Sequence, residues 1–129
     1  TGHEEIQIAM LGLTFKAGTD DLRESPSLKV ASLLLNSGVK IVGYDPQITT
    51  TPLKGLEIVQ SVEEAVKDSD ALVVMTEWER FIDLDPEELI KLMKGKTLVD
   101  TRAILNSKNY VDAGFSVWQT GYGWKKPAK

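Results

Sequence analysis

An α/β fold, in which a mostly parallel sheet of about six strands lies between layers of helices, is predicted by three features of the sequence. The chain has 129 residues, which is enough for one domain with a substantial core. Short apolar runs alternate with segments of helical periodicity, as they do in successive β-α-β units. The first run, residues 6–13, is apolar almost throughout. Such a run is typical of a parallel strand that is covered on both faces.

The first β-α-β unit is marked by clear start and stop signals. Strand 6–13 is followed by a long polar loop, and Ser25 and Pro26 are typical of an N-cap and a first helical position. Apolar residues at helical spacing continue to Asn36, and Gly38 is suited to a left-handed cap. A second strand is expected to end just before Asp45, so the unit predicts two parallel strands joined by one helix.

The second half of the chain continues the same alternation after a connector. A capping box begins at Ser61, and an Asp-Pro pair at Asp85 repeats this start signal. The expected elements are strand 56–59, helix 61–67, strand 71–75, helix 85–93, strand 96–99, a short helix within 106–113 and strand 115–118. We expect one domain over residues 6–122, a cloning remnant or interdomain linker at 1–5, and a loose tail at 123–129.

The composition excludes several classes of protein. The chain carries 15 Lys and Arg against 19 Asp and Glu, a net charge of −4, which argues against a general nucleic-acid binder. No apolar run approaches the roughly 20 residues of a membrane-spanning helix, and no secretory signal pattern is present. There is no cysteine and a single histidine, His3, so thiolate catalysis, cysteine zinc sites and histidine chemistry are not expected.

The loop after the first strand is the first candidate site, because ligands of such sheets bind outside the carboxyl ends of the strands. The loop lacks the short glycine-rich turn of dinucleotide-binding folds and the Gly-Lys-Ser/Thr of a P-loop. Lys16 and Arg23 are therefore either cations that meet a phosphate or members of a solvated loop whose charges pair with Asp20, Asp21 and Glu24. Long loops in compact α/β domains are more often functional than idle.

Arg102 is the second candidate, because it directly follows an apolar strand at the same predicted edge of the sheet. The donor fork of a guanidinium there suits a carboxylate, a phosphate or the edge of a base. The alternative is an ion pair with Asp100 or Glu77. The residue types alone leave both interpretations open.

Asp45 lies where a dinucleotide-binding domain keeps the acid that contacts the ribose. A turn residue in front of Pro46 is the favoured interpretation on pattern alone. Trp78 and Phe81 are interpreted as packing residues in preference to a stacking platform for a base.

Residues 11–26, LGLTFKAGTDDLRESP, resemble the signature that opens the C-terminal domain of the UDP-glucose/GDP-mannose dehydrogenase family. Further similarities are GYDP at 43–46, TEW at 76–78 and DTR at 100–102, the last with Thr101 where the family commonly has glycine. Together the similar segments extend over roughly residues 6–122 and favour the UDP-sugar branch. The resemblance implies a Rossmann-like three-layer sandwich.

The resemblance also implies a place in a three-part enzyme. An N-terminal domain holds NAD, a central helical domain carries the catalytic cysteine and forms a homodimer, and the C-terminal domain binds the nucleotide half of the sugar nucleotide. The family oxidises the sugar 6-hydroxyl to a carboxylate in two NAD-dependent steps, in the cytoplasm. This chain would be the third part, without catalytic residues or a metal, and UDP-glucose is the favoured substrate over GDP-mannose and UDP-N-acetyl sugars.

By position, the resemblance assigns substrate contacts to Phe15, Lys16 and Arg102, and a contact with NAD to Arg23. The implied partners are a UDP-sugar and the N-terminal and central domains of the same polypeptide, with neither nucleic acid nor membrane. The alternative from another class is a stand-alone nucleotide-binding or regulatory module without catalysis. The signature favours the dehydrogenase, because an isolated module would not need Arg23 for a second cofactor.

Overall fold

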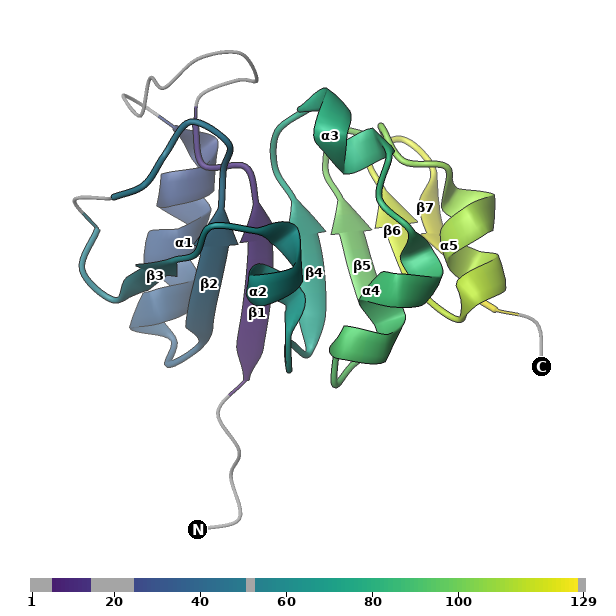
Figure 1. Cartoon of the computed structure of the whole chain (residues 1–129), viewed down its shortest axis with the longest axis horizontal. Helices are drawn as coiled ribbons and strands as arrows, with labels where there is room; N and C mark the ends of the chain where they lie inside the picture. Colours follow the sequence, from purple (N-terminus) through teal and green to yellow (C-terminus); the bar gives the residue numbers. More distant parts are fainter. Residues whose placement is uncertain (1–5, 15–24, 51–52, 128–129) are drawn as a thin grey trace, which may run out of the picture.

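The computed structural model describes residues 6–14, 25–50 and 53–127, which form a seven-stranded sheet with helices on both faces (Figure 1). The strand order is β3-β2-β1-β4-β5-β6-β7; the first six strands are parallel, and β7 is antiparallel to β6. The strands are β1 (Gln7–Leu11), β2 (Lys40–Tyr44), β3 (Leu56–Ile58), β4 (Ala71–Val74), β5 (Thr97–Asp100), β6 (Ser116–Gln119) and β7 (Gly123–Lys125). The helices are α1 (Pro26–Asn36), α2 (Val62–Val66), α3 (Glu79–Ile82), α4 (Pro86–Leu92) and α5 (Ser107–Ala113). The predicted α/β class with a mostly parallel sheet is confirmed.

The helices begin where the sequence places their caps. The Ser25 hydroxyl accepts a hydrogen bond from the Leu28 amide, and the Ser61 hydroxyl accepts one from Glu64. Asp85 caps α4 through the amide of Glu87. These contacts satisfy amide groups that the first turn of a helix leaves without partners.

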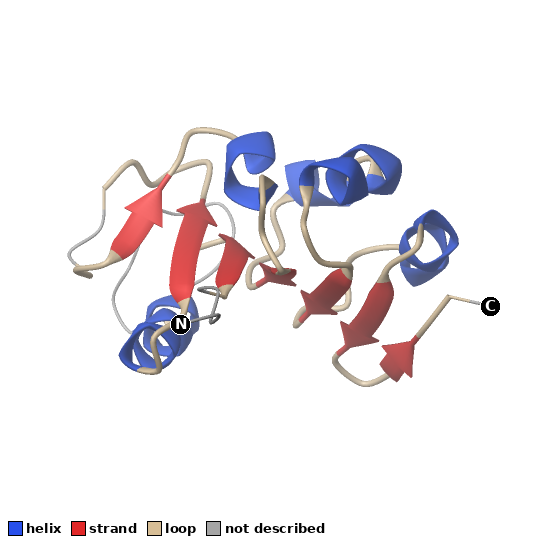
Figure 2. Cartoon of the chain, turned by 90° about the horizontal axis from the view of Figure 1, so that it is seen from below, coloured by secondary structure: helices blue, strands red, loops and turns tan. Residues whose placement is uncertain are grey.

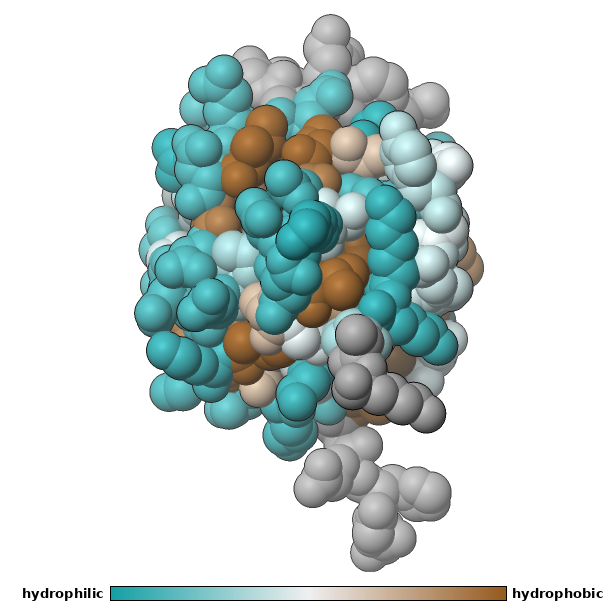
Figure 3. Space-filling view, turned by 90° about the vertical axis from the view of Figure 1, so that its right-hand side faces the viewer, coloured by the Kyte–Doolittle hydropathy of each residue, from teal (hydrophilic) through white to brown (hydrophobic). Residues whose placement is uncertain are grey.

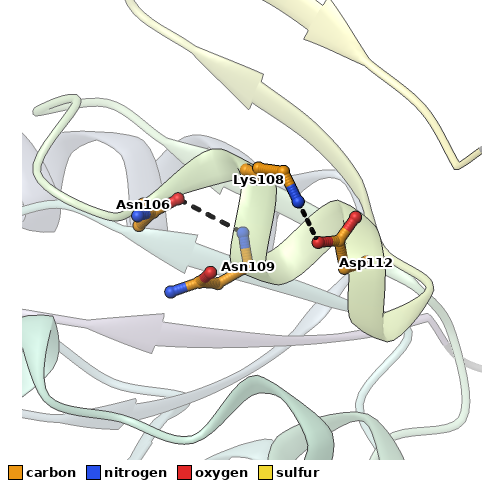
Figure 4. A network of polar contacts seen from close by, with 4 residues as sticks. All are labelled: Asn106, Lys108, Asn109 and Asp112. Carbon is orange, nitrogen blue, oxygen red and sulfur yellow. Dashed lines mark hydrogen bonds and ion pairs between the residues drawn. The ribbon is translucent and has the colours of Figure 1, made fainter.

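Helix α5 is likewise stabilised by contacts between residues close in the sequence (Figure 4). Asn106 Oδ1 accepts from the Asn109 amide at 3.2 Å, and Lys108 Nζ lies 2.6 Å from Asp112 Oδ2 one turn further on. The helix ends at Gly114, whose φ of 116° lies in the left-handed region. Both ends of the helix are therefore determined by nearby residues.

The two faces of the sheet carry separate apolar cores and unequal helical cover (Figure 2). Helices α2, α4 and α5 cover one face over a core that includes Leu72, Phe81 and Leu98. On the other face α1 packs over the half formed by β1 to β3, with Met10 and Ile41 beneath it. Among the described residues no helix covers the remaining half of that face. None of the described helices is long and apolar enough to span a membrane.

Two elements differ from the sequence prediction. The loose tail expected at 123–129 is wrong for residues 123–125, which form the seventh strand, with Trp124 in register with Trp118. A tight turn at Gly121, where φ is 86°, brings this segment back to the sheet. Helix α3 was not expected either; it is a single turn that buries Phe81. Figure 3 shows the end of the molecule near β7, where hydrophobic patches lie between hydrophilic side chains.

Tyr110 on α5 has a hydroxyl that is buried without a hydrogen-bond partner. Its ring packs against Phe115, with the ring centroids 5.6 Å apart. Burial raises the pKa of the Tyr110 phenol, and the negative charges of Asp100 and Asp85 raise it further. The folded chain therefore keeps this phenol neutral at a pH at which the unfolded chain has lost the proton.

We expect Tyr110→Phe to flatten the loss of stability in alkaline solution. The contribution of the raised pKa is complete below about pH 10, the value for an unfolded tyrosine, and is lost as the pH rises above it. Wild type should therefore lose up to about 1.4 kcal/mol per pH unit more than the variant between about pH 10 and 12. At neutral pH the two should agree within about 1 kcal/mol, because no hydrogen bond is removed. Urea unfolding measures both, and the exposed Tyr122→Phe is the control; equal pH profiles for wild type and Tyr110→Phe would contradict this expectation.

Candidate functional site at the carboxyl edge of the sheet

The candidate site lies where the carboxyl ends of β1, β4 and β5 meet. The chain passes from β3 at one edge of the sheet to β4 next to β1, so the strand order reverses between β1 and β4. In open parallel sheets this switch point leaves a crevice in which ligands bind. The segments after the three strands are therefore the ones whose side chains matter most.

Gly12 and Thr76 bring the ends of β1 and β4 into close contact. Gly12 has a φ of 98°, and a Cβ at this position would lie 2.8 Å from the Thr76 backbone nitrogen. The Gly12 amide donates to the Tyr44 carbonyl at 2.8 Å, which ties β1 to β2 as well. Thr76 is 1% exposed, and its hydroxyl has no hydrogen-bond partner in the part of the chain that the structure describes. The sequence places Thr76 in the TEW segment but gives it no role, because its contact with Gly12 joins residues distant in the chain.

The beginning of α1 closes the base of the segment between residues 14 and 25. The Ser25 hydroxyl donates to the Leu13 carbonyl at 2.7 Å while it caps the helix. Ser27, in the first turn, is buried, and its hydroxyl has no hydrogen-bond partner among the described residues. Because Pro26 has no N–H and Ser25 caps the Leu28 amide, Ser27 is the residue of this first turn whose amide and hydroxyl have no partner among the described residues, and a helix N-terminus of this kind favours an anion.

The Asp45 carboxylate is buried at the end of β2, with 2% of the residue exposed. Its Oδ2 accepts from the backbone amides of Leu13 at 2.8 Å and Thr14 at 3.2 Å. The Thr14 hydroxyl and the Trp78 indole donate to the same oxygen, both at 3.3 Å. Oδ1 accepts from the Gln47 amide at 2.9 Å, as a turn residue does. Asp45 thus joins the ends of three strands.

Arg102 leans toward the switch point from the end of β5. Its Nε donates to the Met75 carbonyl at 3.0 Å, and its backbone amide donates to Asp100 Oδ1 at 3.1 Å. The alternative ion pair with Asp100 or Glu77 is absent from the described part of the chain. There, the two terminal guanidinium nitrogens of Arg102 have no partner, so the side chain is anchored at one nitrogen and free at the other two.

Asp100 accepts the hydrogen bond of the Arg102 backbone amide and so holds the turn that carries Arg102. The sequence did not reveal this role. Asp100 is fully buried, and its Oδ2 accepts from the Leu105 amide and from Gln119 Nε2, each at 2.9 Å. Thr101 donates its hydroxyl to the Val74 carbonyl at 2.7 Å. In the same turn, the backbone of Ala103 has a left-handed conformation, with a φ of 54°.

Some of the remaining sequence predictions concern described residues, and the others concern residues outside the described ranges. Arg102 lies at the expected edge, and Phe81 is fully buried, as expected of a packing residue. Trp78 packs against the same core, although its indole also reaches Asp45. The predicted site residues Phe15, Lys16 and Arg23 lie outside the described residues, as do Asp20, Asp21 and Glu24.

The described residues do not fit NAD as dinucleotide-binding domains hold it. Among the described residues, the first helix after Gly12 is α1, which begins at Pro26. Thr76 fills the space on the Cβ side of Gly12, and the Gly12 amide already donates to the Tyr44 carbonyl, so this glycine offers no free amide to a phosphate. Asp45 is only 2% exposed and already accepts hydrogen bonds at both oxygens, so a ribose would have to compete with protein donors in a buried position. In the described ranges no three His, Asp or Glu side chains are placed to hold a metal ion.

The strand order and the polar groups at the switch point define a Rossmann-like domain. The family model described as "UDP-glucose/GDP-mannose dehydrogenase family, UDP binding domain" matches residues 9–107, and the chain belongs to this family. A UDP-glucose 6-dehydrogenase from Rhizobium meliloti (strain 1021) is 41% identical over 112 residues, which is 84% of this chain and 26% of that protein.

Solved structures of similar proteins agree with the fold. A UDP-D-ManNAc dehydrogenase from Pyrococcus horikoshii is 36% identical with a TM-score of 0.77, over 92% of this chain and 26% of that one. An NDP-N-acetyl-D-galactosaminuronic acid dehydrogenase from Methanosarcina mazei Go1 is 27% identical with a TM-score of 0.84, over 93% of this chain and 25% of that one. The chain thus spans about a quarter of the length of these relatives.

Proposed function

We propose that this chain is the nucleotide-sugar-binding C-terminal domain of an NAD-dependent UDP-glucose 6-dehydrogenase, which oxidises UDP-glucose to UDP-glucuronate in two steps. The observation that carries the proposal is Arg102, whose Nε is anchored to the Met75 carbonyl at the switch point and whose terminal nitrogens have no partner among the described residues. A guanidinium held in this way can donate two hydrogen bonds to a phosphate or to a base edge. The unpaired Ser27 and Thr76 hydroxyls at the same edge add further donors.

In this proposal the chain binds and orients the substrate but does not oxidise it. Phe15, Lys16 and Arg102 contact the UDP-sugar, and Arg23 reaches the NAD, which is held mainly by the N-terminal domain of the same polypeptide. NAD, when bound there, accepts the hydride. The chain has no cysteine, so the thiol that covalent catalysis requires comes from the central domain. A homodimeric parent and a cytoplasmic location are further implications of the family.

A UDP-N-acetyl-sugar 6-dehydrogenase is the second candidate. The Pyrococcus horikoshii protein, 36% identical to this chain, is described as a UDP-D-ManNAc dehydrogenase. The sugar at the 6-hydroxyl end distinguishes the two candidates, whereas UDP is common to both. A thermal-shift panel of UDP, UDP-glucose, UDP-N-acetyl sugars, GDP-mannose and NAD would rank the ligands.

The proposal is tested by titrating UDP into the isotope-labelled chain and following amide chemical shifts. We expect binding with a Kd on the order of 0.1–1 mM, equivalent to about −4 to −5.5 kcal/mol, because half of the cleft is missing. Shifts should gather at residues 12–14, 25–27 and 100–102 and be weaker with GDP. No shift at millimolar UDP would contradict nucleotide binding, and production of NADH from UDP-glucose by the chain alone would contradict the assigned role.

Arg102→Ala is expected to weaken UDP binding about tenfold or more. A hydrogen bond to a charged group contributes about 1.5–3 kcal/mol, and the variant removes the whole donor fork. Lys96→Ala is the matched control, because it removes one positive charge from the opposite end of the same region of the sheet. Isothermal titration or the amide shifts give the affinities, and similar losses in the two variants would mean that general charge, not Arg102, attracts the nucleotide.

A further inference from the structure

We propose that Asp45 is a positioning residue, not a ribose ligand: its carboxylate fixes the backbone of Leu13 and Thr14 and so determines where the substrate-binding segment leaves the sheet. This inference rests on the proposed function for its ligand, UDP. It separates two roles that the same residue can have in Rossmann-like domains, where an acid at the end of the second strand commonly contacts the ribose.

The hydrogen bonds of Asp45 and its burial both disfavour a ribose contact. Each carboxylate oxygen offers about two lone-pair sites, so the four donors around Oδ2 saturate it, while Oδ1 accepts from the Gln47 amide. The four donors converge on Oδ2 from Leu13, Thr14 and Trp78. Only 2% of the residue is exposed, so a ribose hydroxyl would have to displace protein donors in a buried position.

The same hydrogen bonds place one end of the signature segment. Leu13 and Thr14 directly precede Phe15 and Lys16 in the chain, so the backbone from which these two residues start is held by Asp45. The other end is held at the same point, because Ser25 donates to the Leu13 carbonyl. The base of the segment is therefore closed by Asp45 and Ser25 together, and a small change in the backbone of Leu13 and Thr14 moves the point from which the segment starts.

Asp45→Asn tests the positioning role, since it keeps the size of the side chain but turns one acceptor oxygen into a donor. Asp70→Asn is the matched control: Asp70 Oδ2 accepts from the Gln7 amide at 2.9 Å, at the amino end of β1 and thus at the opposite edge. Three measurements are made where both variants are folded. These are amide hydrogen exchange at Leu13 and Thr14, the Kd for UDP, and the ratio of the Kd values for UDP and 2′-deoxy-UDP.

For Asp45→Asn we expect exchange at Leu13 and Thr14 to be at least about tenfold faster and the Kd for UDP to rise about tenfold, because lost hydrogen bonds and misplaced contacts both cost this much. The ratio of UDP to 2′-deoxy-UDP should stay within about twofold of wild type, because Asp45 does not contact the ribose. Asp70→Asn should leave the Kd unchanged. A purely structural Asp45 would lower stability without changing the Kd of the folded variant, which would overturn the inference.

Two other results would overturn it as well. If the preference for UDP over its deoxy analogue disappeared in Asp45→Asn, Asp45 would be a ribose ligand. If exchange at Leu13 and Thr14 matched wild type, the carboxylate would not hold them. Should wild type fail to bind UDP, the proposed function fails, and the exchange rates still decide whether Asp45 holds this backbone. If Asp45→Asn does not fold, Trp78→Phe removes only the indole donor; faster exchange and a weaker Kd support positioning, and no change in either contradicts it.

Discussion

Gly12→Ala is expected to lower the unfolding free energy of the domain by about 2–5 kcal/mol, because a conformational penalty and an overpacking penalty add. The φ of 98° is unfavourable for any residue with a Cβ. That Cβ would also overlap the Thr76 hydroxyl and lie 2.8 Å from the Thr76 backbone nitrogen. Neither strand end can move apart without breaking the hydrogen bond between Met75 N and the Leu11 carbonyl. Single domains have only about 5–15 kcal/mol of stability, so this loss is a large fraction of the total.

Gly38→Ala is the control that separates the conformational penalty at Gly12 from the penalty for the contact with Thr76. Gly38 has a similar φ of 88°, but nothing lies within 4 Å of the position of its Cβ. Its replacement should therefore cost only the conformational term, about 1–2 kcal/mol. Urea unfolding followed by circular dichroism measures both variants. Equal losses at Gly12 and Gly38 would show that the contact with Thr76 relaxes at no cost.

Asp100→Ala is expected to lower the unfolding free energy by at least about 3 kcal/mol, since each buried donor left unpaired costs about 1–3 kcal/mol. The carboxylate accepts from Arg102 N, Leu105 N and Gln119 Nε2, and the residue is 0% exposed. Water cannot replace these partners without opening the core. Because Arg102 N is one of the donors, the turn that carries the Arg102 side chain should also loosen.

Asp100→Asn refines this prediction, because the amide keeps the shape but can accept at only one oxygen. We expect a loss smaller than that of Asp100→Ala, and a combination with Gln119→Ala that is clearly less than additive, because the two side chains share a hydrogen bond. Asp112→Ala, which removes an exposed carboxylate on α5, is the control and should cost less than about 1 kcal/mol. Additive losses for Asp100 and Gln119 would contradict the network.

The local elements of this domain were determined by the sequence itself. The apolar run before Gly12 predicts the central strand, and the caps at Ser25, Ser61 and Asp85 predict three helix starts, all of which are confirmed. Each of these signals acts over no more than a few residues, because a cap joins a side chain to an amide in the next turn. For the same reason these caps and apolar runs can be recognised in the sequence without knowledge of the fold.

The roles of single side chains at the carboxyl edge were decided only by the tertiary structure. From the sequence, Asp45 was either a ribose-binding acid or a turn residue; its turn contact is with Gln47, but its other donors lie 31 to 33 positions away. The Arg102 anchor, the Met75 carbonyl, is 27 positions distant. The strand pairing of β7, which no local pattern indicated, likewise depends on an edge that only the finished sheet provides. Hydrogen bonds of this kind depend on which strands become neighbours and in which register, and the order of residues along the chain does not contain that information locally.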